Sequence, residues 1–150
     1  MSAVLVRQAV VQDIPALAAL VDQYRQFQGQ PADPMAAQAF LRERFDHGES
    51  VVFLAAVGAE PAGFAQLYPL FSTVALRRAF ILNDLFVGPA WRRLGVATRL
   101  LEAVEAHGHT MQAVRLSLNV ARNNPAAQQL YRERGWCEDQ QFLMFNRSLP

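Results

Sequence analysis

The sequence predicts a three-layer α/β fold in which a mixed sheet carries helices on both faces. The predicted elements follow the order strand, two helices, three strands, helix, strand, helix, strand. The strand–helix–strand unit at residues 79–120 requires a parallel pair, because a crossover helix returns the chain to the same end of the sheet. The hairpins that precede this unit make antiparallel pairs, so the sheet is mixed.

The chain is expected to form one domain over residues 1–150. A chain of this length buries roughly 68–70% of its unfolded surface, enough for a core without disulfides or metals. Apolar residues make up 52% of the sequence and charged residues 18%, a balance that favours a compact globule. No repeat, low-complexity segment or long linker divides the chain.

The N-terminal part predicts a strand and two helices. Residues 4–10 are rich in β-branched side chains, as strands are. Asp13 can cap the next helix, with Pro15 in its first turn. Residues 29–31 end that helix, and Asp33-Pro34 starts another. The apolar faces are expected at Ile14, Leu17, Leu20, Val21 and Tyr24 in the first helix and at Ala36, Phe40 and Phe45 in the second.

The central part predicts three strands and a helix. Residues 50–57 form a continuous apolar run, which is typical of a strand covered on both faces. A turn at 58–61 leads to a strand at 63–71, and another strand follows at 79–87. The next helix is expected at about 95–107, with Val96, Leu100, Leu101 and Val104 inward.

The C-terminal part predicts a strand at 114–120, a helix and then one or two final strands at 136–146. Asn124-Pro125 opens the helix, with Asn as its cap and Pro at the first position. Gly135 closes the helix where a left-handed residue is favoured.

The composition excludes several functions. The formal net charge of +1 gives no electrostatic signature of nucleic-acid or acidic-membrane binding. All 14 basic residues are arginines, so neither a Schiff base nor a lysine-containing phosphate loop can form. Cys137 is the only cysteine, which excludes an intrachain disulfide and a multi-cysteine zinc site. His107 and His109 have no apparent third ligand, so we expect no metal.

The sequence also bears on the compartment. No apolar run reaches the ~18 residues needed to cross a bilayer. Residues 1–11 lack a basic region followed by a long apolar stretch, so they do not resemble a signal peptide. We expect a soluble, cytoplasmic protein.

Residues 85–98 join a predicted strand to a predicted helix and are the first candidate for chemistry. Helix N-termini present unpaired N–H groups and a partial positive charge, which suit a phosphate. Gly95 lets the backbone approach closely and Ala97 leaves room, while Arg92 and Arg93 add charged donors. The segment predicts a pyrophosphate cradle. The alternative is an ordinary strand–helix connection with surface arginines.

Residues 124–136 form the second candidate. They place Tyr131 on the inner side of a short helix, seven residues after the Asn124 cap. A tyrosine at such a position is often ordinary core whose hydroxyl merely finds a partner. Here it follows the strand expected to lie parallel to the strand that leads into the cradle.

Together these segments resemble the GNAT superfamily of N-acetyltransferases. The family motif Q/R-x-x-G-x-G/A is matched by Arg92, Gly95 and Ala97, and it follows a Leu-x-Val-x-Pro strand matched by Leu85, Val87 and Pro89. The motif Asn-x-x-Ala-x-x-x-Tyr-x-x-x-Gly-Phe is matched by Asn124, Ala127, Tyr131 and Gly135, with Trp136 in place of Phe. The element order also agrees, so the resemblance covers nearly the whole chain.

The resemblance implies that acetyl-CoA is the co-substrate and that no metal takes part. Acyl transfer to an amine would proceed by direct attack. The pantetheine arm would lie along the backbone of Leu85, Phe86 and Val87. The pyrophosphate would lie over Arg92, Arg93, Leu94, Gly95, Val96, Ala97 and Thr98. The thioester would enter where two parallel strands separate near Val87 and Asn119. Asn124 would contact the cofactor, and Tyr131 would protonate the departing thiolate.

The general base is the open part of this hypothesis. Many relatives carry Glu at the position of Asn83, and an amide cannot act as a base. Asp84 is the nearest carboxylate and is the candidate. Its alternatives are a role in a strand bulge or in positioning the substrate, with a water chain carrying the proton.

The acceptor is not encoded in a motif. A small amine is the first hypothesis, an amine on a protein or peptide is the second, and a non-catalytic acyl-CoA sensor is the third. A homodimer is expected by analogy with relatives, with the hairpin tip at residues 72–78 as a possible contact. Aromatic candidates for the acceptor pocket, each also a candidate for ordinary core, are Tyr24, Phe27, Tyr68, Phe71 and Phe80.

Overall fold

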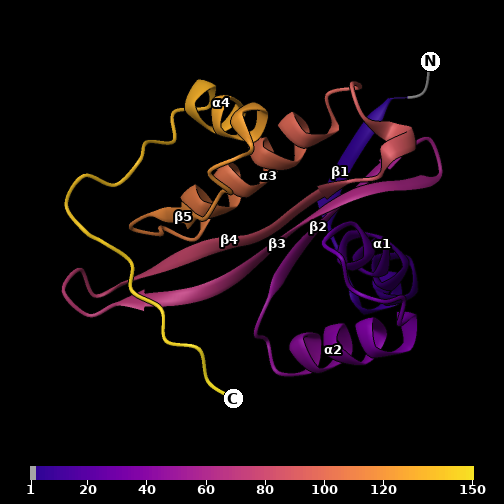
Figure 1. Cartoon of the computed structure of the whole chain (residues 1–150), viewed down its shortest axis with the longest axis horizontal. Helices are drawn as coiled ribbons and strands as arrows, with labels where there is room; N and C mark the ends of the chain where they lie inside the picture. Colours follow the sequence, from indigo (N-terminus) through magenta and orange to yellow (C-terminus); the bar gives the residue numbers. More distant parts are fainter. Residues whose placement is uncertain (1–2) are drawn as a thin grey trace. The chain divides into compact units, whose positions relative to one another are not determined.

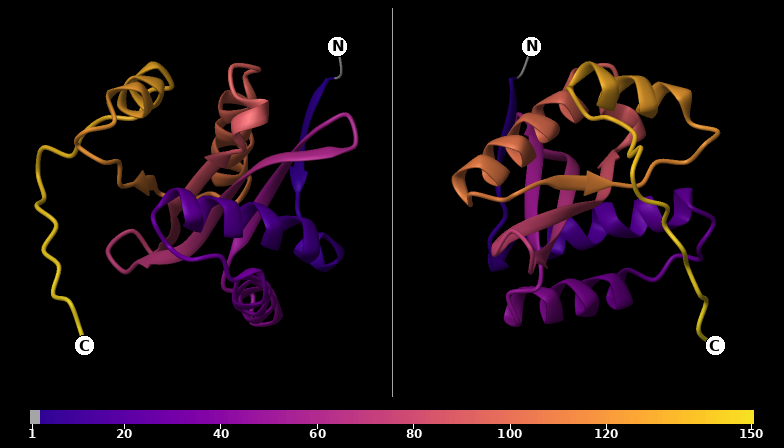
Figure 2. Two further views of the ribbon diagram at one scale, coloured as in Figure 1. Left: turned by 45° about the vertical axis from the view of Figure 1, so that its right-hand side comes forward. Right: turned by 90° about the vertical axis from the view of Figure 1, so that its left-hand side faces the viewer.

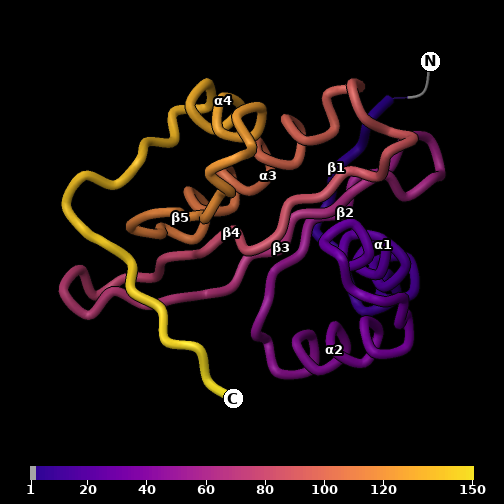
Figure 3. The backbone as a smooth tube through the Cα atoms, in the orientation of Figure 1, coloured from indigo at the N-terminus to yellow at the C-terminus, as the bar shows by residue number. Residues whose placement is uncertain are grey.

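The computed structural model describes residues 3–150. It divides into two compact units, Met1–Asn119 and Val120–Pro150. The chain can be followed from end to end in Figure 3. The elements are β1 (Val4–Gln8), α1 (Ile14–Phe27), α2 (Pro34–Asp46), β2 (Val51–Val57), β3 (Glu60–Ser72), β4 (Arg77–Val87), α3 (Val96–Thr110), β5 (Leu116–Leu118) and α4 (Pro125–Glu133), with short 3₁₀ turns η1 (Val11–Asp13) and η2 (Pro89–Trp91).

The first unit is built on one mixed sheet in the order β1-β2-β3-β4-β5 (Figure 1). The three pairs from β1 to β4 are antiparallel, and β4 pairs with β5 in parallel. The parallel pair is joined through α3, as the sequence predicted from the crossover. The β3–β4 hairpin projects past the other strands of this unit (Figures 1 and 3).

Helices cover both faces of the sheet in the first unit (Figures 1 and 2). α1 and α2 pack on one face, where the hydrophobic core includes Leu17, Leu41 and Phe64. α3 packs on the other face, where the ring of His107 meets the rings of Phe53 and Phe80. The predicted inward positions of α3 are all buried: Val96, Leu100, Leu101 and Val104. The mixed α/β sandwich expected from the sequence is therefore confirmed.

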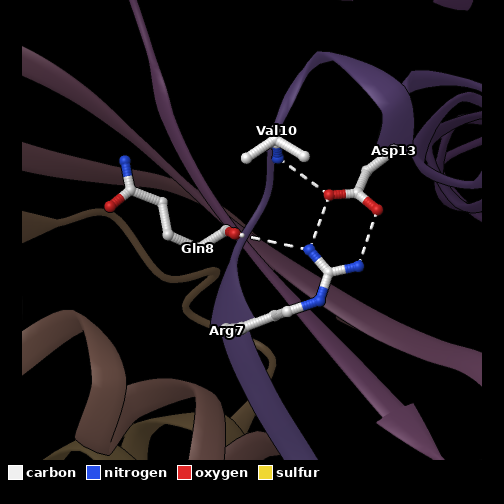
Figure 4. A network of polar contacts seen from close by, with 4 residues as sticks. All are labelled: Arg7, Gln8, Val10 and Asp13. Atoms are coloured by element: carbon white, nitrogen blue, oxygen red, sulfur yellow. Dashed lines mark hydrogen bonds and ion pairs between the residues drawn. The ribbon is translucent and has the colours of Figure 1, made fainter.

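Asp13 precedes α1 as predicted, but it does not cap that helix through its side chain. Its carboxylate accepts two bonds from the Arg7 guanidinium, both 2.7 Å, and one from the Val10 N–H at 2.8 Å (Figure 4). A forked arginine offers a carboxylate two aligned charged bonds, which compete successfully with a single cap bond. The hydrogen bond from Arg7 holds the pKa of Asp13 below its usual value.

The apolar stripe of α2 was predicted wrongly at two positions. Ala37 and Leu41 are the buried residues, while Ala36 is exposed and Phe40 is 45% exposed. Phe45 packs against the core as expected. The buried side chains follow the spacing i, i+4, i+8, and the exposed Phe40 ring is covered by the Arg44 guanidinium at 4.5 Å instead.

The C-terminal segment forms no strand within the described residues, contrary to the prediction for residues 136–146. The apolar pattern there favours extended backbone, but a strand also needs a neighbouring strand to complete its ladder, and the second unit contains none. Five of its large apolar side chains are exposed: Phe142, Leu143, Met144, Phe145 and Leu149. β5 is likewise shorter than predicted, at Leu116–Leu118.

No helix in the described part of the chain has the length and apolar character needed to span a membrane.

Candidate active site

The predicted cradle lies at the N-terminus of α3. Gly95 is the residue before the helix and has a φ of +79°, and Arg93 also has a positive φ, of +64°. A left-handed residue next to a right-handed one turns successive N–H groups to one side, which is how anion-binding nests form, and Gly95 directly before the helical Val96 has this arrangement. A β-carbon at Gly95 would meet no atom within 4 Å, so the space beside this residue is open. This geometry fits a phosphate group.

Arg92 is engaged beside the cradle. Its Nε donates to the Val87 carbonyl at 3.1 Å, and its guanidinium lies 5.2 Å from the centre of the Phe27 ring. The side chain therefore braces the turn between β4 and α3, and only its two outer nitrogens remain for a phosphate. Arg93, Leu94 and Gly95 are exposed, while Val96 is buried beneath them.

The predicted separation of the parallel strands is present. β4 pairs with β5 only from Phe80 to Leu82, and the last pair is Leu82 with Leu118. The remainder of β4, from Asn83 to Val87, has no β5 partner, so backbone groups on that edge are left for another extended chain. Leu85, Phe86 and Val87 lie on this edge as predicted, and Asn119 follows β5 directly.

A bulge in β4 sets the face to which its later side chains point. Gln66 pairs with Asp84 and Leu67 with Leu82, so Asn83 is one extra residue on β4. Before the bulge, Leu82 is buried on the face that α3 covers. After it, Asp84 and Phe86 point to the face of α1. Without the bulge, regular alternation would keep all of them on one face.

The bulge gathers four polar side chains, which we call the polar cluster: Gln66, Tyr68, Asn83 and Asp84. The amide nitrogens of Gln66 and Asn83 both donate to Oδ2 of Asp84, at 2.9 and 3.0 Å. Burial raises the pKa of Tyr68 to about 12, and the nearby Asp84 charge adds to that rise. The phenol of Tyr68 is therefore neutral at physiological pH.

Aromatic rings pack on the same face of the sheet as this cluster. Tyr24 of α1 stands edge-on to Phe64 with ring centres 5.9 Å apart, and 5.4 Å from the ring centre of Phe86. Tyr24 and Tyr68 were among the predicted pocket residues. Phe80 lies on the opposite face against His107 and is ordinary core. Phe71 is 72% exposed at the hairpin.

Two residues at this site escaped the sequence analysis. Gln66 is only 4% exposed, and polarity inside an apolar strand was the available signal. Gly63 faces Val87, and a β-carbon there would lie 2.5 Å from the Phe86 carbonyl oxygen. Only glycine therefore permits this close approach of β3 to the end of β4.

The remaining predicted residues lie in the second unit. The Asn124 side chain accepts a bond from the Ala127 N–H at 3.2 Å, which confirms it as the cap of α4. Tyr131 lies on α4 with its ring centre 6.1 Å from that of Trp136. Burial raises the pKa of Tyr131 above its usual value. Gly135 ends the helix with a φ of +90°.

Among residues 3–150, no group of three or more His, Cys, Asp or Glu side chains is placed to hold a metal ion. His107 lies between two aromatic rings of the core, with a lowered pKa caused first by burial and then by Arg78.

The geometry can be compared with known proteins. Residues 16–136 match the Acetyltransferase (GNAT) family. The chain is 41% identical over 145 residues to "Uncharacterized N-acetyltransferase YhfO" of Bacillus subtilis (strain 168), covering 97% of each chain. A crystal structure of "a probable acetyltransferase" superposes with a TM-score of 0.93 at 35% identity, covering 97% of this chain and 98% of the other.

A crystal structure of a "predicted acetyltransferase with acetyl-CoA" from Clostridium acetobutylicum has a TM-score of 0.76 at 15% identity and covers 96% of each chain. At that identity the likeness shows the fold alone. The family match and the 41% identical relative show more than the fold. The chain belongs to the GNAT family and is an acetyltransferase.

Proposed function

We propose that this enzyme transfers the acetyl group of acetyl-CoA to a primary amine of a small molecule. The observation that carries the proposal is the open left-handed turn at Arg93 and Gly95, which adjoins the unpaired edge of β4. A nest for a pyrophosphate and an edge for an extended arm are the two features that a coenzyme A ester needs. The proposal treats residues 1–150 as one functional domain, and the family match over residues 16–136 supports this for most of the chain.

The residues present fit the co-substrate. The N–H groups of Val96, Ala97 and Thr98 open α3 and have no carbonyl partner within a helix, since the first such bond runs from Arg99 to Gly95. They would hold the pyrophosphate together with Arg92, Arg93 and Leu94. The edge at Leu85, Phe86 and Val87 would pair with the pantetheine amides. Asn119 and Asn124 would contact the co-substrate beyond the strand gap.

The proposed chemistry is direct transfer. The ammonium group of the acceptor loses a proton to Asp84, and its nitrogen then bonds to the thioester carbonyl carbon. The Val87 N–H stabilises the oxyanion. When the carbon–sulfur bond breaks, the thiolate takes the proton of Tyr131. The nitrogen, which is positively charged after the attack, gives its second proton to water as the amide forms. The products are an N-acetyl amine and free coenzyme A; Asp84 then returns its proton to water and Tyr131 takes one back.

Two other functions were considered. An amine on a protein or peptide would use the same chemistry with a different acceptor surface. A sensor would bind acyl-CoA without turnover, and the loss of glutamate at Asn83 favours it. Tyr131 is half-buried with a raised pKa and keeps its proton, which favours the enzyme, since a sensor needs no acid. The proposal includes a cytoplasmic location and a homodimer.

Thiol release from acetyl-CoA tests the proposal across polyamines, amino acids, aminoglycosides and short peptides. Turnover of a small amine supports it, and turnover of peptides alone transfers the function to the second candidate. If acetyl-CoA raises the Tm but no amine releases thiol, the protein is a sensor and the proposal fails.

A further inference from the structure

The amide of Gln66 has a fixed orientation at the centre of the polar cluster. Its Nε2 donates to Oδ2 of Asp84 at 2.9 Å. Exchanging the amide oxygen and nitrogen would place two acceptor oxygens against each other, so the orientation follows from the contact. The Gln66 carbonyl oxygen, Oε1, must therefore point away from Oδ2.

That carbonyl oxygen has no donor. Gln66 Oε1 is buried and has no hydrogen-bond partner among the described residues. Folding a polar atom away from water without a partner is costly, and such atoms often mark places where another group binds. The side chain is 4% exposed, so Gln66 belongs to the interior of the protein and is not a surface glutamine.

The neighbouring carboxylate of Asp84 also has one oxygen that accepts neither of these hydrogen bonds. Both amide donors reach the same atom of Asp84, Oδ2, from Gln66 at 2.9 Å and from Asn83 at 3.0 Å. Within residues 3–150, no ion pair or hydrogen bond is recorded at Oδ1 of Asp84. Gln66 and Asp84 are paired residues of β3 and β4, and within the described residues each has one acceptor oxygen with no recorded donor.

We propose that Gln66 is a specificity-determining residue, and that its Oε1 and Oδ1 of Asp84 together bind the primary ammonium group of the acceptor. This inference rests on the proposed function and names the chemistry of its acceptor. A primary ammonium carries three N–H groups and one positive charge. It supplies one bond to the amide oxygen and one to the carboxylate, which also removes its proton.

The surroundings of the cluster suit a cation. The rings of Tyr24, Phe64 and Phe86 lie within 6.3 Å of one another, and Tyr68 adds a neutral phenol beside Asp84. Aromatic faces attract an ammonium ion, and Tyr24 is the ring of the three that is partly exposed. Water does not reach Oε1 in the ligand-free protein, so the neighbouring side chains must shift as the amine enters.

The test compares two matched pairs of amines, benzylamine with N-methylbenzylamine and butylamine with N-methylbutylamine. Methylation replaces one N–H by a methyl group and leaves the charge unchanged. The wild type should prefer each primary amine in kcat/KM, because its three N–H groups reach both oxygens in every rotamer about the C–N bond, whereas the two N–H groups of the methylated amine reach both in only one rotamer. Gln66→Met keeps the length of the side chain and removes its oxygen, and we expect the preference to fall by about tenfold.

The ratio of kcat/KM for the primary amine to kcat/KM for the methylated amine distinguishes a role of Gln66 in recognition from a purely structural role. If Gln66 only stiffens the sheet, Gln66→Met lowers kcat/KM for both amines equally and leaves the ratio unchanged, which overturns the inference. Gln38→Met, an exposed glutamine on α2, is the matched control and should change neither value. If Gln66→Met does not fold, Gln66→Asn takes its place. This variant shortens the side chain by one methylene, which moves the amide oxygen away from the ammonium group, and it must lower the preference for the primary amine.

The inference and the proposed function fail in different ways. If the wild type acetylates other amines but neither benzylamine nor butylamine, the two oxygens do not recognise an ammonium as such and the inference is wrong. If no amine at all is acetylated while acetyl-CoA still raises the Tm, it is the proposed function itself that is wrong.

Discussion

Tyr131 and Gly95 carry the proposed chemistry at the scale of single residues. Burial raises the pKa of Tyr131 above 10.0, so the phenol keeps its proton through the neutral range and can give it to a thiolate. Gly95 holds a φ of +79° with open space where a side chain would stand. The sequence pattern predicts a role for both residues because the motifs that contain them depend on local spacing.

The first prediction concerns the acid. Tyr131→Phe removes the hydroxyl and keeps the ring, so kcat should fall by about 10²-fold or more. The Kd of acetyl-CoA should stay the same, because the ring continues to pack against Trp136. Steady-state kinetics and a binding titration measure the two effects. Undiminished kcat in this variant would rule out Tyr131 as the acid.

The second prediction concerns the cradle. Gly95→Glu puts a negative side chain in the open space beside the turn and should raise the Kd of acetyl-CoA by at least about tenfold. Gly48→Glu is the matched control, since Gly48 also has a positive φ, +62°, and no atom within 4 Å of a β-carbon. Both variants bear the strain of a left-handed side chain, about 1–2 kcal/mol. Equal affinity in the two variants would contradict the cradle.

At the scale of elements, α3 packs on β4 through a neutral histidine. The His107 ring lies 5.6 Å from the centre of the Phe53 ring and 5.3 Å from that of Phe80, and its Nε2 is buried without a recorded partner. Burial, with Arg78 adding to it, lowers the pKa of His107 below 6.5. The helix and sheet are therefore held together best when this ring carries no charge.

The third prediction follows from that packing. The unfolded chain binds a proton at His107 more readily than the folded chain, so stability is complete above about pH 6.5 and is lost as the pH falls below it. Thermal unfolding from about pH 7.5 to about pH 5 should show a smaller decrease in Tm for His107→Phe than for the wild type. If the two slopes are the same, His107 is not the titrating group.

Element boundaries show where sequence reasoning reached its limit. The β3–β4 hairpin and α3 were predicted because their apolar periods are long and regular. The stripe of α2 was misplaced, since Ala36 and Ala37 are equally apolar and only packing against the sheet selects Ala37. The strands expected at 136–146 are absent from the described structure, because a pattern cannot supply the neighbouring strand.

At the scale of the whole molecule, the family and the fold could be predicted from three short motifs, but the acceptor could not. Gln66 belongs to no sequence motif, and its proposed role depends on the strand register that places it opposite Asp84. Pairing of this kind is fixed by contacts between distant parts of the chain, which local spacing does not record. Asp84 itself was identified only because it is the carboxylate nearest to Asn83.

The fourth prediction concerns assembly. The hairpin tip exposes Val74 at 99% and Leu76 at 85%, and such apolar tips are often covered by a second copy. Val74→Asp should convert the proposed homodimer into a monomer in light scattering coupled to size-exclusion chromatography. Met35→Asp is the control, because Met35 is 82% exposed on α2 and should leave the mass unchanged. A dimer that survives Val74→Asp does not use this tip.

The bulge at Asn83 also governs where the chain can change length. In a regular strand, side chains two residues apart point to the same face. Because Asn83 is an extra residue, Asp84 and Phe86 instead point to the face opposite to that of Phe80. Losing one residue here would turn Asp84 and Phe86 away from α1 and remove the carboxylate from its site, whatever residue remained. The turn between Ser72 and Arg77 has no such consequence, because a residue gained there lies beyond the last paired position. Insertions and deletions accumulated over evolution should therefore cluster at the hairpin turn and avoid the span from Leu82 to Val87.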